Sequence, residues 1–427
     1  MDGQFPDPAA GIAVEAMPAA AAGIGGNRAV STWFFAMAGA VVVLNLFSAQ
    51  PLVDVIGPAI GLAPSAYGLV SMLTLLGYAA GLILLVPMVD LTENRRLILQ
   101  MLVGDVLALT VAALAQQSWI FLAASFALGM TMSVIQMLVP LAASLSPESQ
   151  RGRVVGNVMS GLMLGIMLSR PLASLIAEYL GWRSVYGLSA IAVALLVVAL
   201  TLRLPRRRPA PGLSYAALIG SLWTLMRSEK VLRLRAATAG LCFGSFSLFW
   251  TAIALRLHAA PFQLSANGLA AFALAGVGGI VMAPLAGRLG DRGWGEAAAV
   301  ISDLLVIGAM ALAWLAGSDG LASHPAWALG LMVAAALLLD LGVVGDQTLG
   351  RRAINLLNPA ARGRLNGLFT GSFFIGGACG SLAAGAAWVW AGWSLICLLA
   401  ILAGAAACLL SLLDWFGTKS RSVRKIG

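Results

Sequence analysis

Charged residues are unusually few in this sequence. Only 10% of its 427 residues are Asp, Glu, Lys or Arg, whereas 60% are hydrophobic. Soluble domains carry about 25% charged residues, because a water-exposed surface must be covered by polar groups. The scarcity of charge therefore excludes an ordinary soluble protein, and we expect most of the chain to lie in lipid.

Cysteine and histidine are also rare. The chain contains four cysteines, Cys242, Cys379, Cys397 and Cys408. All four lie within apolar runs and none has a Cys-x-x-Cys spacing, so neither a disulfide framework nor a metal site is predicted. The two histidines, His258 and His324, stand alone at the ends of apolar runs and are expected to be surface residues.

Two kinds of catalytic motif are missing. A phosphate-binding loop of the form Gly-x4-Gly-Lys-Ser/Thr does not occur, which argues against ATP-driven activity. Neither a nucleophile–base pair nor a metal cluster is evident, so we expect a protein that is not an enzyme and needs no cofactor.

What the chain does contain is a series of apolar runs of about 20 residues, the length that crosses a bilayer core. The runs are 31–52, 67–89, 96–116, 119–143, 154–177, 183–204, 236–258, 266–289, 297–316, 325–349, 364–388 and 391–413. A polar segment in the middle divides them into six and six.

These runs define five predicted segments: a tail at 1–29, a bundle at 30–204, a loop at 205–235, a second bundle at 236–413 and a basic tail at 414–427. The first tail is rich in Ala, Gly and Pro and lacks the features of a signal peptide, so we expect it to be disordered. Within the loop, Leu218, Leu222 and Leu225 recur at helical spacing and predict an amphipathic helix.

The basic residues indicate the orientation of the chain. If the N-terminus is cytoplasmic, 23 of the 26 Lys and Arg residues lie in cytoplasmic gaps or tails. The three exceptions are Arg170, Arg183 and Arg256. Because cytoplasmic loops attract Lys and Arg, both termini are predicted inside. The net charge of +9 then reflects topology and does not call for a nucleic-acid partner.

An internal repeat relates the two halves with an offset of 211 residues. Residues 151–183 and 362–393 both begin with Arg-Gly-Arg and end near Gly-Trp. The matched pairs are Gly152 and Gly363, Arg153 and Arg364, Gly156 and Gly367, Gly165 and Gly376, Gly181 and Gly392, and Trp182 and Trp393. Such a repeat predicts two related bundles that rock around a midplane site.

Short charged loops occupy equivalent places in the two halves. They contain Asp90, Arg95 and Arg96 in the first half and Gly287, Asp291 and Arg292 in the second. With the repeat and the charge distribution, this loop pair resembles the major facilitator superfamily. The resemblance implies an all-α polytopic membrane protein with twelve transmembrane helices in two pseudo-symmetric six-helix bundles. It also implies that the loop acids pair with helix starts of the opposite half, near Arg153 and Arg364, and lock one face shut.

Other segments resemble bacterial drug or sugar efflux permeases of the proton antiporter branch. They are RRLIL after Asp90, QMLVPLAASLSP around Gln136, and LSRP at Arg170. The predicted fifth and eleventh helices also contain a pattern that is similar to the glycine signature of the family's antiporters. Its residues are Gly156, Gly165, Pro171, Gly367, Gly376 and Gly380. Close helix packing, with no role in exchange, explains these glycines equally well. The predicted fourth helix lacks the arginine that many proton-coupled drug antiporters of the family have.

Polar groups within apolar runs are costly and need a partner or a function. Asp340 lies midway along the predicted tenth helix and is our candidate for the protonatable coupling acid, because burial disfavours a charged carboxylate. A fixed ion pair is the alternative. Arg170 and seven further residues are placed on the pathway: Asn45, Gln50, Gln136, Phe246, Trp250, Asp346 and Gln347. We expect few aromatic residues in the central cavity, and we interpret Asp105 and Asp303 as structural.

These observations predict a secondary transporter that exports a small organic molecule in exchange for protons. An uptake symporter of the same fold is the alternative, and a membrane-embedded enzyme or sensor is a third. The expected partners are the substrate, protons and the lipid bilayer, with a monomer embedded in the bacterial cytoplasmic (inner) membrane.

Overall fold

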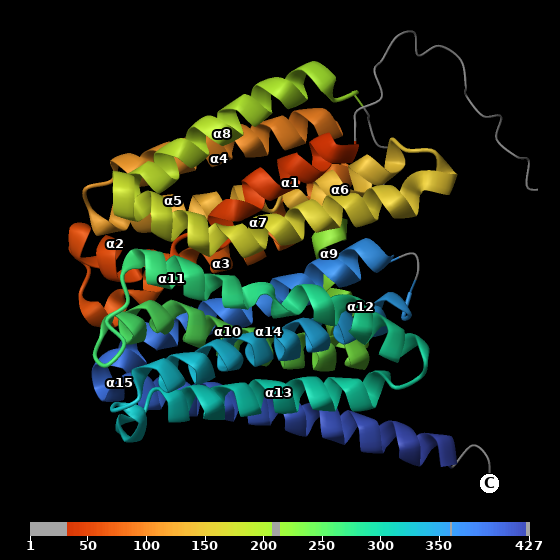
Figure 1. Cartoon of the computed structure of the whole chain (residues 1–427). Helices are drawn as coiled ribbons and strands as arrows, with labels where there is room; N and C mark the ends of the chain where they lie inside the picture. The colour runs from red at the N-terminus through yellow and green to blue at the C-terminus, as the bar shows by residue number, and fades with distance from the viewer. Residues whose placement is uncertain (1–31, 207–213, 359–360, 424–427) are drawn as a thin grey trace, which may run out of the picture.

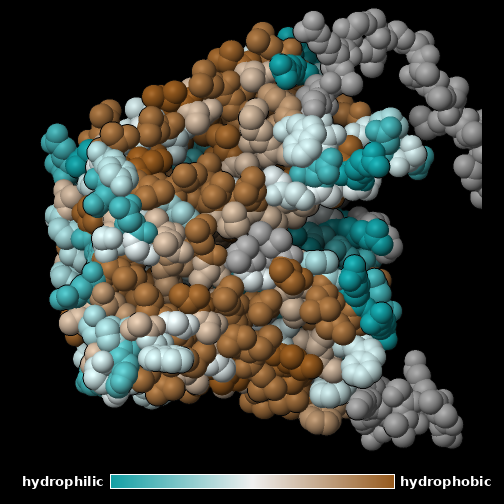
Figure 2. All heavy atoms as spheres, in the orientation of Figure 1, coloured by the Kyte–Doolittle hydropathy of each residue, from teal (hydrophilic) through white to brown (hydrophobic). Residues whose placement is uncertain are grey.

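The protein is described by a computed structural model that covers residues 32–206, 214–358 and 361–423. The predicted tail at 1–29 lies outside this range. Within it the secondary structure is helical, and most helices run side by side (Figure 1). Hydrophobic residues form a belt around the middle of the molecule, and hydrophilic residues gather at its two ends (Figure 2).

Eleven helical stretches in this part of the chain are long and apolar enough to span a membrane. The last of them, Arg362–Phe416, has 55 residues and is long enough to cross twice. Its backbone leaves the helical region at Ala391 and Gly392, where φ of Gly392 is 61°. Gly181, its partner in the repeat, has φ of 83°. A positive φ favours glycine, so the repeated Gly-Trp marks a turn between two crossings. The twelve predicted crossings are confirmed.

The N-terminal bundle is formed by α1 (Thr32–Phe47), η1 (Gln50–Leu52), α2 (Val53–Ala59), η2 (Pro64–Ala66), α3 (Gly68–Leu84), η3 (Val86–Asp90), α4 (Asn94–Leu114), α5 (Ser118–Met132), α6 (Ile135–Ser144), η4 (Glu148–Gln150), α7 (Arg151–Leu180) and α8 (Trp182–Arg203). The C-terminal bundle is formed by α10 (Lys230–His258), α11 (Ala266–Ala273), η5 (Leu274–Val277), α12 (Gly278–Asp291), α13 (Gly295–Ala316), η6 (Asp319–Leu321), α14 (Pro325–Asn355) and α15 (Arg362–Val423). The two bundles occupy opposite halves of the molecule (Figure 1).

We call the end of the molecule where α1 begins and α15 ends the terminal face, and the opposite end the far face. The helix α9 (Tyr215–Ser228) lies at the terminal face between the two bundles (Figure 1). The Ser214 side chain accepts a hydrogen bond from the amide of Ala217 and caps this helix. Leu218 and Leu222 are its buried residues. The Tyr215 hydroxyl donates to the carbonyl of Leu84 at 3.0 Å, which ties α9 to the N-terminal bundle.

The two bundles meet where α3 packs against α15 and where α7 packs against α11. The α3–α15 contact is closest near the far face. A Cβ atom on Gly68 would lie 1.9 Å from the carbonyl oxygen of Ser381, and one on Gly385 would lie 2.6 Å from that of Ser65. Backbones can come this close only where side chains are missing, so these glycines allow the far face to close.

Polar side chains also join the bundles at the far face. The Nδ1 atom of His258, at the end of α10, lies 2.6 Å from a carboxylate oxygen of Asp54 in α2. The amide of Asn267 donates to the hydroxyl of Tyr179 at 3.3 Å. The sequence predicted His258 as a lone surface residue, and the structure instead makes it one side of a contact between the halves.

We expect this histidine contact to be a pH-dependent latch on the far face. Protonated His258 would form an ion pair with Asp54, so lowering the pH through the usual histidine range strengthens the contact. A partly exposed pair of this kind contributes at most about 1 kcal/mol, which is about a fivefold shift in the open population. His258→Ala should therefore increase maleimide labelling of a Ser381→Cys probe, at a buried position of α15 next to Gly68, in detergent-purified protein lacking Cys379.

The pH dependence provides the control for the latch. Because maleimide reacts with the thiolate, labelling at each pH is divided by that of the same protein unfolded in denaturant. This ratio should fall from pH 8 to pH 5.5 for the otherwise unaltered Ser381→Cys protein, while His258→Ala should show no such fall. His324→Ala, which removes an exposed histidine bonded only to Ser323 in the described structure, should behave as the unaltered protein does. Equal labelling of all three proteins at both pH values would exclude the latch.

Candidate substrate pathway

A cavity of about 750 Å³ lies between the two bundles. It is lined by residues of the terminal half of the molecule, including Asp90 at the end of η3 and Gly363 at the start of α15. Figure 2 shows a notch between the bundles on the terminal side. A cavity of this volume fits a small organic molecule. The conformation is therefore open to the terminal face and closed at the far face.

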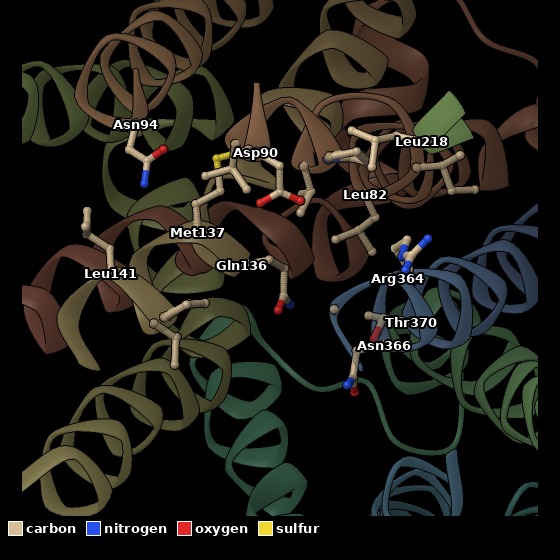
Figure 3. Close-up of a pocket in the computed structure, with 18 of the residues that line it drawn as sticks. Leu82, Asp90, Asn94, Gln136, Met137, Leu141, Leu218, Arg364, Asn366 and Thr370 are labelled. Carbon is tan, nitrogen blue, oxygen red and sulfur yellow. The ribbon is translucent and has the colours of Figure 1, made fainter. Parts of the chain in front are cut away.

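The cavity walls are apolar with a few polar groups (Figure 3). The apolar part includes Leu82, Ile83, Met137, Leu141, Met159, Leu162, Leu218 and Leu222. Polar groups face one another from the two bundles: Gln136 from α6 on one wall, and Asn366 and Thr370 from α15 on the other (Figure 3). The amide of Gln136 donates to the hydroxyl of the buried Tyr78 at 3.2 Å.

A cluster of aromatic rings separates the cavity from the centre of the molecule. The ring of Tyr78 lies 4.5 Å from that of Phe374, and Phe374 lies 5.4 Å from Phe243. The ring of Phe243 stacks on Phe246 at 5.3 Å, and Phe246 lies 6.1 Å from Trp250. These rings come from α3, α10 and α15. The described residues that line the cavity itself include no aromatic side chain, which agrees with the expectation of few aromatics in the cavity.

Arg170 of α7 lies at the inner end of this aromatic cluster. Its Nε donates to the side-chain oxygen of Gln50 at 2.9 Å. Its guanidinium carbon lies 4.3 Å from the centre of the Trp250 ring, 4.9 Å from Phe47 and 5.2 Å from Phe246. Aromatic faces attract cations, so these rings hold the arginine, which is only 4% exposed.

Asp340 of α14 approaches Arg170 from the opposite bundle. A Cβ atom on Gly276 would lie 3.4 Å from Oδ2 of Asp340, 3.5 Å from the Trp250 ring and 3.8 Å from Nη1 of Arg170. In the part of the chain that the structure describes, Nη2 of Arg170 and Oδ1 of Asp340 have no hydrogen-bond partner. The carboxyl and the guanidinium therefore face the same small space, and each has bonding capacity to spare.

Breaks in two membrane-spanning stretches position these groups. The first stretch stops being α-helical after Phe47, and its 3-10 turn begins with Gln50, the partner of Arg170. The stretch at 266–291 changes to the 3-10 turn η5 at Leu274–Val277, which contains Gly276. Interrupted helices at the midplane commonly form transporter binding sites. The glycine-rich segment AGVGG is the sequence signal for the second break. Hydropathy alone does not reveal this break, because the segment contains no polar or charged side chain.

Of the predicted pathway residues, Gln50, Phe246 and Trp250 contact Arg170, and Gln136 lines the cavity. Asn45 is buried in α1, and the nitrogen of its side-chain amide has no hydrogen-bond partner within residues 32–206, 214–358 and 361–423.

Asp346 lies away from the cavity, inside the C-terminal bundle. Its carboxyl is fully buried, and ligand atoms of Asp346, Asp303 and Cys242 all lie within 4.8 Å of one another. The Cys242 thiol donates to Asp303 at 3.3 Å. The neighbouring Gln347 is half-buried and does not line the cavity either. Asp340 and Asp346 have different surroundings because they lie on different faces of α14.

The predicted gating loops are separated in this conformation. Asp90 and Arg364 both line the cavity, but they form no ion pair among the described residues. The other loop acid, Asp291, is 3.1 Å from Arg352 of its own bundle, while Arg153 is exposed. The remaining predicted loop residues lie on the same face: Arg95, Arg96, Gly287 and Arg292. This arrangement agrees with an open terminal face.

The predicted packing glycines differ in what surrounds them. A Cβ on Gly376 or Gly380 of α15 would lie 2.0 or 2.1 Å from a carbonyl oxygen of α10, and one on Gly165 would lie 2.7 Å from the carbonyl of Ala40. Gly156 has open space within 4 Å, and Gly367 makes only an ordinary contact at 3.8 Å. Pro171 is buried inside α7, next to Arg170. Close packing thus requires glycine at three of these positions but not at Gly156 or Gly367.

Two related six-helix bundles that enclose a cavity open on one face and closed on the other define a secondary membrane transporter. The family model for the Major Facilitator Superfamily matches residues 35–349. The chain belongs to this family, which confirms the resemblance drawn from the loops and the repeat. It is therefore an integral multi-pass membrane transporter for small molecules rather than an enzyme.

Relatives and a solved structure agree with this assignment. The chain is 38% identical over 376 residues to the uncharacterized transporter YgaY of Escherichia coli O157:H7, covering 88% of this chain and 92% of that protein. A probable sugar efflux transporter of Pasteurella multocida is 24% identical over 219 residues, covering 50% and 52%. The crystal structure of a D-xylose-proton symporter superposes with a TM-score of 0.68 at 14% identity, covering 88% and 96%. This last similarity shows the fold alone.

Proposed function

We propose that this protein exports a small organic molecule across the bacterial cytoplasmic membrane in exchange for protons. The observation that carries the proposal is the buried carboxyl of Asp340, which faces Arg170 of the other bundle beyond a solute-sized cavity. An ionisable carboxyl inside a membrane is costly and is usually functional. Asp340 would bind the proton, and the cavity would bind the solute.

The position of Asp340 suggests how a proton could act on the conformation. Arg170 and Asp340 belong to different bundles and meet at the closed side of the pathway. The charged carboxylate attracts the guanidinium and favours the closed far face. A proton on Asp340 removes this attraction, so proton binding and the separation of the bundles would be linked.

Two further observations support the proposed orientation in the membrane and the proposed direction of transport. The concentration of Lys and Arg in the gaps of the terminal face supports a cytoplasmic position for that face and for both termini. The open cavity would then take up solute from the cytoplasm. One relative is named a sugar efflux transporter, which supports export. The solved proton symporter keeps uptake as the second candidate.

Vesicle transport tests the proposal. A panel of labelled sugars, organic acids and amphipathic drugs is offered to everted and right-side-out membrane vesicles containing the protein, with an imposed pH gradient. We expect gradient-dependent accumulation of at least one compound in everted vesicles only, abolished by a protonophore and missing from vesicles without the protein. Accumulation only in right-side-out vesicles would establish the uptake symporter instead.

A further inference from the structure

A second arginine of the pathway, Arg351, lies in the cavity wall. It is located in the last turns of α14, and its side chain lines the cavity. Its Nε atom is buried and has no hydrogen-bond partner in the described structure, where no carboxylate forms an ion pair with it either. The neighbouring Arg352 is different, because it is paired with Asp291 at 3.1 Å on the rim.

An unpaired guanidinium in a membrane-embedded cavity is energetically unfavourable. Among the residues that the structure describes, the charged ones that line the cavity are Arg351, Arg364 and Asp90. Their formal charges leave a surplus of one positive charge. A bound molecule with a single negative charge would neutralise this surplus, whereas a neutral molecule would leave it uncompensated.

The surroundings of Arg351 provide a second donor for such an anion. The hydroxyl of Thr370 and the amide of Asn366 line the same cavity as Arg351. The amide of Gln136, also in the wall, donates to the buried hydroxyl of Tyr78 at 3.2 Å. A guanidinium with a hydroxyl in the same cavity wall is well suited to a carboxylate, which accepts two parallel bonds from arginine.

The rest of the wall indicates what the carboxylate is attached to. Leu82, Met137, Met159 and Leu162 line the same cavity, and methionine adapts to ligands of varied shape. We propose that Arg351 binds the carboxylate of the transported molecule, which is a small organic monocarboxylate with a largely apolar body. This assignment rests on the proposed transport function and adds the chemical class of its substrate.

Matched pairs of compounds test the assignment without a transport assay. Purified protein in detergent is heated with phenylacetate or phenylacetamide, and with nicotinate or nicotinamide, over a range of concentrations. We expect at least one acid, but neither amide, to raise the melting temperature. Arg351→Gln should weaken the response by about 10- to 100-fold, as expected for losing a charge-assisted bond. Arg351→Lys should keep part of the response.

Arg352→Gln is the matched control, because it removes the same charge from the next residue on α14, and it should respond as the natural protein does. Elution volume and the melting temperature without ligand report whether each variant is folded. Equal responses of the Arg351→Gln and Arg352→Gln proteins, or stabilisation by the amides but not the acids, would overturn the assignment.

Vesicle transport separates this inference from the proposed function. Proton-driven export of only neutral compounds would overturn the carboxylate assignment and leave the transport function standing. Binding of an acid that depends on Arg351, with no movement of that acid under any gradient, would refute the transport function instead.

Discussion

Replacing Asp340 with asparagine is expected to abolish the response of transport to a pH gradient. Asparagine has nearly the same shape as aspartate but cannot bind or release a proton, so the proposed link between protonation and the Arg170 contact is lost. Net transport driven by an imposed gradient in proteoliposomes should fall to the level of liposomes without protein. Exchange of labelled for unlabelled solute, which requires no net proton movement, should persist.

Asp105 provides a matched control for this prediction. Its carboxyl is also fully buried in a membrane-spanning helix, α4, but it accepts a hydrogen bond from Thr131 at 3.0 Å within its own bundle. Asp105→Asn should keep gradient-driven transport if it folds. Unchanged net transport driven by the pH gradient in the Asp340→Asn protein would show that another group couples the proton.

Replacing Gly376 with a larger residue is expected to destabilise the C-terminal bundle strongly. A Cβ at this position would lie 2.0 Å from the carbonyl oxygen of Gly240, and a backbone oxygen cannot move aside without shifting α10. Overpacking typically costs about 1–3 kcal/mol, so Gly376→Ala should lower the melting temperature clearly. Gly376→Leu should give little folded protein by size-exclusion chromatography.

Gly156 is the control from the other half of the repeat. An added Cβ there would meet nothing within 4 Å, and alanine is favoured over glycine inside a helix by about 0.5–1 kcal/mol. Gly156→Ala should therefore leave the melting temperature unchanged or raise it slightly. A similar loss of stability in the Gly156→Ala and Gly376→Ala proteins would contradict the packing explanation.

The internal repeat predicted equivalent glycines, yet their surroundings are not equivalent. Gly376 packs against α10, while its partner Gly165 approaches Val43 and Ala40 of α1. Gly156 and Gly367 lie on parts of their helices with room around them. A repeat preserves the path of the backbone, but the closeness of a neighbouring helix depends on side chains outside the repeated segment.

The candidate site was predictable only in part. Asp340 and Arg170 were recognisable as costly charges in apolar runs, but their approach through the gap at Gly276 depends on a helix break that hydropathy does not reveal. Arg351 was counted among the basic residues of a loop, whereas α14 extends to Asn355 and brings its side chain into the cavity.

By itself, the sequence determined the number of crossings, the division into two related bundles and the family. These features follow from local properties, because a bilayer requires apolar runs of a set length and a duplicated half repeats its turns. Only the tertiary structure decided which polar groups meet. The rotation of α14 turns Asp340 toward Arg170 and Asp346 toward Asp303, and the approach of the bundles joins His258 to Asp54. Such contacts depend on how helices far apart in the chain pack and break, which no local pattern encodes.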